Sequence, residues 1–190
     1  MCSRILGSLP DTITVDGSEI KIKNTDFRNA LVIVQAVNDP DLSEYEKALI
    51  MVDRLIGVEN IPAGKGDDVA QQCRIWMDGG VDYSDKSQKP QLIDWEQDEQ
   101  MIFSAVNKVY GHETRTEKYL HWWSFLGLFN EISDGLFSTV LAIRQKRKKG
   151  KKLDKAEREF YLANRDIIDI HPRLSAEEQA EVDALNEIFK

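Results

Sequence analysis

The most apolar part of the chain reads TEKYLHWWSFLGLFNEI, from Thr116 to Ile132. Stepping these residues around a helix at ~100° each places the apolar side chains on an arc wider than half the circumference. The members of that arc are Tyr119, Trp122, Trp123, Phe125, Leu126, Phe129 and Ile132. We therefore expect a helix that either lies at the centre of a mainly α-helical fold or faces a partner.

Three further helices are expected on the C-terminal side of this stretch. The first carries Leu136, Val140 and Ile143 at helical spacing and ends in a basic run. Helix-opening patterns at 154–157 and 175–178 predict the other two. The last of them, within 171–190, has few apolar residues to bury, so we expect it to dock loosely.

Two short alternating segments near the N-terminus predict the only β-structure. Thr12 to Val15 and Ser18 to Lys23 alternate apolar and polar residues, and Asp16-Gly17 between them suits the positive φ of a tight hairpin turn. The chain then supplies helix-capping residues at 24–26 before an apolar helical pattern that begins at Phe27. A β-hairpin followed by a helix is expected.

The remaining N-terminal and central helices are marked by caps and by loops. Ser43 and Glu46 form a capping box, Gly57 ends that helix, and a shorter helix is expected over 67–77. Residues 79–93 are rich in Gly, Ser, Asp and Lys at their start and predict a loop. Asp94 and Gln97 repeat the capping-box pattern and predict a helix that runs to Gly111.

These elements predict one helical domain of seven or eight helices with a short N-terminal hairpin. Its parts are the hairpin and first helices in 1–78, the loop in 79–93, the C-terminal helical part in 94–170 and the terminal helix in 171–190. A chain of 190 residues with 42% hydrophobic residues can fill one such core.

Charge and cysteine usage restrict the function classes. The chain has 25 basic and 33 acidic residues, a net charge of −8, which opposes non-specific binding to nucleic acid or anionic membranes. Cys2 and Cys73 are expected to be free thiols in a reducing compartment. Neither a signal peptide nor a membrane span is recognisable, so we expect a cytosolic protein without membrane contact.

Catalytic and metal-binding patterns are missing from the sequence. His112, His121 and His171 are scattered, and none has a second His at helical metal-site spacing. The carboxylates of Asp94, Glu96, Asp98 and Glu99 suit the first turn of a helix, where they favour the helix dipole. We therefore expect no metal, no cofactor and no enzymatic activity.

Seven Lys or Arg residues lie within 144–152. Cations stabilise the C-terminus of a helix, and no aromatic residues are interleaved to stack on bases. The run is therefore interpreted as a solvated helix end. The alternative function is a small nucleic-acid-binding regulator of a mobile element that uses these residues.

The pair Trp122-Trp123 is the strongest candidate for a functional surface. Tryptophan often anchors protein interfaces, yet it is equally common in cores. Adjacent helical positions point ~100° apart, so the two rings need not share a role. The candidate partner-binding residues are Tyr119, Trp122, Trp123, Phe125 and Phe129.

Several short motifs, in this order, resemble the "gene product fifteen" family of phages of Gram-positive bacteria. They are Thr25-Asp26-Phe27-Arg28, Asp94-Trp95-Glu96-Gln97-Asp98, Tyr110-Gly111 and Leu120-His121-Trp122-Trp123-Ser124-Phe125. The resemblance covers about 9–162. It makes Asp26, Phe27, Arg28, Asp94, Trp95, Glu96, Asp98 and His121 candidate structural motif residues.

The resemblance implies a tail-assembly chaperone of a long-tailed phage. Such a protein would bind the helical tape-measure protein while the tail tube polymerises, and the tail-tube protein is a further candidate partner. It would act in the host cytoplasm, associate with itself, and be absent from the finished virion. We expect apolar stripes of the tape measure to dock around Trp122, Phe125 and Phe129.

Overall fold

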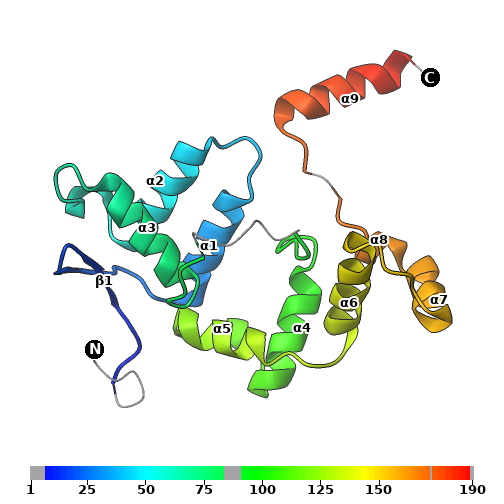
Figure 1. Ribbon diagram of the computed structural model, residues 1–190, viewed down its shortest axis with the longest axis horizontal. Coiled ribbons are helices and arrows are strands. Elements are labelled where there is room, and N and C mark those ends of the chain that lie inside the picture. Colours follow the sequence, from blue (N-terminus) through cyan, green and yellow to red (C-terminus); the bar gives the residue numbers. More distant parts are fainter. Residues whose placement is uncertain (1–6, 84–90, 172, 189–190) are drawn as a thin grey trace.

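The computed structural model describes residues 7–83, 91–171 and 173–188. It is mainly α-helical, with 58% helix and one antiparallel hairpin near the N-terminus, which confirms the predicted fold class. Figure 1 shows helices α1 to α3 on one side of a central pair, α4 and α5, with α6 to α8 on the other side.

The hairpin pairs β1 (Thr12–Val15) with β2 (Ser18–Lys21). Its register places Thr12 opposite Lys21 and Val15 opposite Ser18. Asp16 and Gly17 at the turn have φ values of 49° and 79°, the left-handed conformation that this turn requires. Ile13 and Val15 are buried, and β1 packs against α3 (Gly66–Met77), so the hairpin closes one end of the core.

The first helices follow the predicted caps. Helix α1 (Phe27–Val37) begins after Asp26, and α2 (Glu44–Leu55) begins at the capping box of Ser43 and Glu46. A short 3-10 helix, η1 (Val58–Asn60), follows Gly57 and leads to α3. Helices α1 and α2 pack against each other, and α3 packs on α2.

The C-terminal part contains six α-helices among the residues that the structure describes. They are α4 (Glu99–Tyr110), α5 (Trp122–Asn130), α6 (Leu136–Lys148), α7 (Lys155–Ala163), α8 (Arg165–Ile168) and α9 (Ala176–Ile188), with the 3-10 helix η2 (Thr114–Thr116) between α4 and α5. The short α8 was not predicted; it follows α7 after the single residue Asn164.

The helix predicted to begin at Asp94 begins five residues later. Asp94 accepts hydrogen bonds from the backbone of Glu96 and Gln97, as a cap would, but residues 95–98 form turns. Gln97 does not reach back to Asp94, because its amide donates to the carbonyl of Asp169 instead. The predicted capping box of Asp94 and Gln97 is therefore wrong, because the Gln97 side chain makes this tertiary contact instead.

The aromatic helix predicted over 116–132 is likewise shorter, since α5 begins at Trp122. The chain before it runs extended beside the start of α1, where the amide of Phe27 donates to Leu120 and the amide of Trp122 donates to Thr25. Tyr119 therefore lies outside the helix, contrary to the predicted arc. It is exposed, and its hydroxyl is 2.7 Å from that of Thr25.

Stacked aromatic rings form the centre of the core. Phe27 of α1 stacks on Phe125 of α5 with ring centroids 4.9 Å apart, and Phe103 of α4 meets both rings edge-on. Trp122 stacks on the other side of Phe125 at 5.7 Å. Helix α5 is therefore the central helix of the fold.

A smaller apolar cluster fastens the C-terminal helices to this core. Val140 and Ile143 of α6 and Ile168 of α8 are fully buried, and Phe160 and Tyr161 of α7 pack against them. Helix α9 differs, since every side chain described in it is exposed. Figure 1 shows this helix apart from the other helices.

Candidate partner-binding surface

The first motif joins α1 to the chain that precedes α5. Asp26 caps α1 by accepting from the amide of Arg28, and its other oxygen accepts from the amide of Leu120 at 3.1 Å. Arg28 donates to both oxygens of Asp26 at 3.0 Å and to the carbonyls of Arg115 and Glu117. We call residues 25–28 together with residues 115–122 the α1–α5 junction.

His121 completes the α1–α5 junction and caps α5. Its Nδ1 accepts from the amide of Trp123 at 3.0 Å, and its Nε2 lies 3.2 Å from the carbonyl oxygen of Pro10. These two contacts suit a neutral ring with the proton on Nε2, which then donates to Pro10. Burial lowers the pKa of His121, while the Pro10 carbonyl and the charge of Asp11 oppose that shift.

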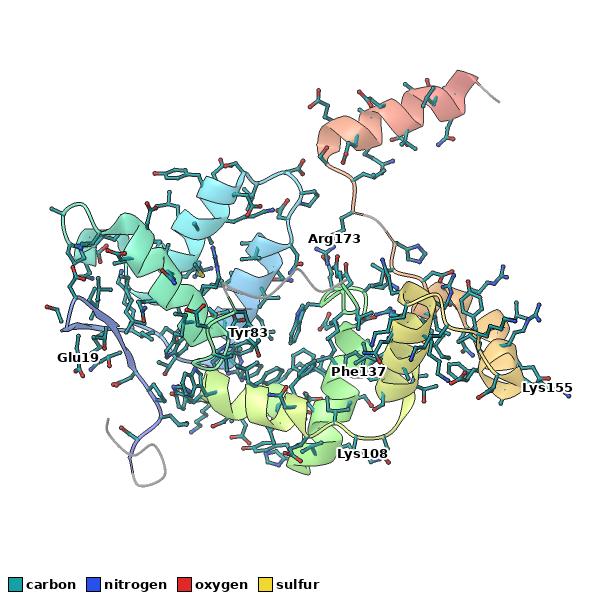
Figure 2. The ribbon with its side chains drawn as sticks, in the orientation of Figure 1. Glu19, Tyr83, Lys108, Phe137, Lys155 and Arg173 are labelled. Atoms are coloured by element: carbon teal, nitrogen blue, oxygen red, sulfur yellow. The ribbon has the colours of Figure 1, made fainter. Side chains whose placement is uncertain are left out.

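The second motif binds the turn before α4 to the chain before α9. Asp94 is buried and receives two hydrogen bonds from Arg173, at 2.6 and 3.2 Å. Burial disfavours the charge on Asp94, but the hydrogen bonds from Arg173, Gln97 and Glu96 outweigh it and lower the pKa. Figure 2 shows Arg173 between the body of the protein and the segment that leads to α9.

Asp98 and Arg144 form a buried ion pair that the sequence analysis missed. Arg144 is 4% exposed, and its two terminal nitrogens contact the two oxygens of Asp98 at 2.6 and 2.8 Å. The same guanidinium donates to the carbonyls of Leu92, Ile167 and Ile168. Arg144 of α6 therefore joins the start of α4 and helix α8 to Leu92, which precedes the motif of residues 94–98.

The interpretation of 144–152 as a solvated helix end is therefore wrong for its first members. Arg144 is buried, Lys146 pairs with Glu157 of α7, and Arg147 pairs with Asp169. Arg144 follows Phe137 and Val140 by seven and four residues, so it shares their buried helix face. That spacing was the signal in the sequence, and the repeated cations around it concealed the signal.

The structure separates the five candidate partner-binding residues. Trp122 and Phe125 are 2% and 0% exposed, and the Trp122 ring nitrogen donates to the carbonyl of Met77 at 2.8 Å. Trp123 is half-buried and donates to the carbonyl of Trp76 at 2.9 Å. Phe129 is half-buried, and Tyr119 is exposed at the α1–α5 junction.

Phe129 lies beside a groove formed by α1, α2, α3 and α5, with a volume of about 640 Å³. We call it the α1–α2–α5 groove. Its apolar lining includes Val34, Val37, Ala48, Met51, Met77, Trp95, Leu126 and Phe129, and charged residues at its sides include Glu44, Lys47 and Arg74. A groove of this kind can receive the apolar face of an amphipathic helix.

Trp95 of the second motif forms one wall of the groove. Its ring stacks on Phe129 at 5.2 Å and lies 6.5 Å from Trp122. Trp95 is only half-buried, so part of the indole remains available to a ligand. The motif of residues 94–98 therefore contains both Asp98, which pairs with the buried Arg144, and Trp95, which forms an accessible wall of the groove.

Chemistry of other kinds has little support in the described residues. Within 7–83, 91–171 and 173–188 no group of three or more His, Cys, Asp or Glu side chains is placed to hold a metal ion. Burial raises the pKa of the Cys73 thiol to about 12, which disfavours the reactive thiolate. The same part of the chain contains no helix with the length and hydropathy to cross a membrane.

The fold and the α1–α2–α5 groove define a mainly helical protein in which the half-buried aromatic residues Trp95 and Phe129 border a groove between helices. Residues 6–170 match the family described as Bacteriophage Gp15 protein, and the chain belongs to that family. Membership identifies it as a phage structural or assembly protein. No curated protein and no solved structure matched the chain.

Proposed function

We propose that the protein is a tail-assembly chaperone that binds the tape-measure protein and keeps it soluble while the tail tube polymerises. The family match over residues 6–170 is the observation that carries this proposal. The α1–α2–α5 groove supports it, because an amphipathic helix of a long helical client could lay its apolar face there.

The docking surface differs from the one expected around Trp122 and Phe125. Phe125 is enclosed in the core, and Trp122 lines the groove but is only 2% exposed, so we assign the docking surface to Trp95, Phe129 and Val37. Met51 and Met77 also line the groove, and flexible thioether side chains adapt to different apolar partners. Weak docking repeated along one long client would add up through multivalency.

Co-expression with the tape-measure protein encoded by the same phage tests the proposal. The soluble fraction of the client is measured with and without the chaperone, followed by affinity capture of the complex. We expect the wild-type protein to keep the client soluble and to be captured with it. A client that stays insoluble, or that is soluble without ever being bound, contradicts the assignment.

A matched pair of double variants tests the groove itself. Val37→Gln with Ala48→Gln places polar side chains in the groove, whereas Val32→Gln with Leu49→Gln changes exposed apolar residues of the same two helices outside it. We expect only the first variant to lose client capture, by about 1 kcal/mol or more per affected contact. Equal capture by both variants would place the client elsewhere.

A further inference from the structure

Helix α9 is acidic, and its described side chains are all exposed. Residues 176–188 contain Glu177, Glu178, Glu181, Asp183 and Glu187 and no Lys or Arg. Two apolar side chains on it are also exposed, Val182 at 38% and Leu185 at 55%. Stepping at ~100° per residue places Glu178, Glu181, Val182 and Leu185 on one face, which we call the α9 face.

Helix α7 carries basic side chains and an exposed leucine on its outer side, where the α9 face carries acidic side chains and a leucine. Its inner side, with Phe160 and Tyr161, packs on the small C-terminal cluster. Its outer side carries Lys155, Arg158 and Leu162, together with Glu159. All of them are exposed, Leu162 at 53%, and Figure 2 shows Lys155 at the outer edge of the molecule.

The basic charge of this outer side extends into the end of α6 and the following loop. Lys148, Lys149, Lys151 and Lys152 are exposed, as are Lys155 and Arg158. Among the described residues none of these six has an ion-pair partner, unlike Lys146 and Arg147. We call Lys148 to Lys152 with Lys155, Arg158 and Leu162 the α7 face.

The two faces match in register as well as in charge. Lys155 precedes Leu162 by seven residues, and Glu178 precedes Leu185 by seven residues, a rise of about 10 Å in each helix. Two such helices laid side by side in parallel bring acidic residues beside basic residues and leucine beside leucine. Opposite charges across a partly apolar contact give both orientation and attraction.

The α9 helix is not placed to cover the α7 face of its own chain. Arg173 pairs with Asp94 and Glu96, and the amide of Ala176 donates to Asp41 at 2.8 Å. These contacts fix the start of α9 near the loop between α1 and α2. Figure 1 shows α9 at the top of the view, well apart from α7.

We propose that the α9 face of one copy of this chain docks on the α7 face of a second copy. The contact exchanges only the C-terminal helix and leaves the α1–α2–α5 groove open in both copies. It is independent of the proposed function, because it needs no client. Residues 176–188 lie beyond the family match, which ends at residue 170, whereas the α7 face lies within it.

Sedimentation of the purified full-length chain over a range of concentrations tests the proposal. We expect association that weakens as salt is raised, because exposed charges are screened over about 10 Å at 0.1 M salt. In Lys155→Glu with Arg158→Glu the dissociation constant should rise on the order of tenfold. Helix α7 should survive this change, since acidic residues are favourable in a first helical turn.

Two controls decide whether the faces meet each other. Lys118→Glu, an exposed lysine outside the α7 face, should associate as the wild type does. Glu178→Lys with Glu181→Lys should weaken association alone, yet mixing it with Lys155→Glu/Arg158→Glu should restore a heterodimer, because each α9 face then meets an α7 face of opposite charge.

Three results would overturn the proposal. One is a wild-type chain that stays monomeric at every concentration. Another is a mixture of the two charge-reversed chains that fails to associate although the wild type does. The third is salt-dependent binding of a short DNA duplex that is lost in Lys155→Glu/Arg158→Glu without any change in self-association, which would assign the basic face to nucleic acid.

Discussion

Arg144 is a single residue on which three helices depend. Its guanidinium is enclosed with Asp98 and donates to three backbone carbonyls, so its removal leaves the buried Asp98 carboxylate without its countercharge and those carbonyls without this donor. Arg144→Met should lower the free energy of unfolding by roughly 3–5 kcal/mol. Chemical denaturation measures the change.

Arg147 provides the matched control, because it is three residues further along the same helix and is 42% exposed in its pair with Asp169. Arg147→Met should cost less than about 1 kcal/mol. If the two variants are equally stable, the buried pair does not have the structural role assigned to it.

His121 should make the stability of the protein depend on pH near neutrality. Its pKa is lowered from 6.5 in the folded state, so the unfolded chain binds the proton more tightly. The free energy of unfolding should therefore fall as the pH decreases through about 6.5. Thermal or chemical unfolding between pH 7.5 and 5.5 measures the slope.

His121→Asn keeps a helix-capping side chain but removes the titrating ring. Its unfolding free energy should vary less with pH than that of the wild type over the same range. The groups facing the ring are the Pro10 carbonyl and the charge of Asp11. A variant with an unchanged pH slope would show that His121 does not titrate in this window.

At the scale of an element, α6 has two kinds of cations at its C-terminal end. Lys146 and Arg147 contact Glu157 and Asp169, and Arg147 also stacks on the ring of Tyr161 at 4.2 Å. Lys146→Gln with Arg147→Gln should therefore lower the melting temperature. The corresponding loss in the free energy of unfolding is up to about 1 kcal/mol per pair.

The neighbouring cations provide the comparison. Lys148→Gln with Lys149→Gln should leave the melting temperature unchanged, because both side chains are exposed and unpaired in the described structure. Similar melting temperatures for the two double variants would argue that the contacts to α7 and to Asp169 add nothing to stability.

Local sequence patterns predicted the helices that depend on local interactions. The capping box of Ser43 and Glu46 uses only neighbouring atoms, and the structure contains it as predicted. Where a side chain serves a distant segment, the local pattern misled. Gln97 bonds to Asp169, and the backbone before Trp122 pairs with residues 25–27, so both predicted helix starts were too early.

The same distinction explains the site residues. The apolar arc of α5 correctly identified a central helix, but a wide arc does not reveal which side meets the core of the same chain. Phe125 stacks on Phe27, and the Trp122 ring nitrogen donates to the carbonyl of Met77. Both partners lie on distant segments. The groove wall at Trp95 arises only when the second motif meets Phe129.

At the scale of the whole molecule, stability should decrease from the aromatic core outward. Phe27, Phe103 and Phe125 join three helices, whereas α9 is exposed along its described length. Amide hydrogen exchange at low protein concentration should therefore be slowest in α1 and α5 and fastest, among the helices, in α9. Strong protection of α9 in the monomer would contradict this order.

The α1–α5 junction joins residues that are far apart in the sequence. Helix α1 is therefore synthesised long before the residues that pack against it. The hydrogen bond from the amide of Leu120 to Asp26 joins residues 94 positions apart. Contacts between such distant residues form more slowly than local helices, because a long loop must first close. During synthesis, the ring of Phe27 stays uncovered by Phe125 until residues 120–125 have emerged. In the proposed chaperone role, the chain would thus need protection of its own apolar surface before it protects that of a client.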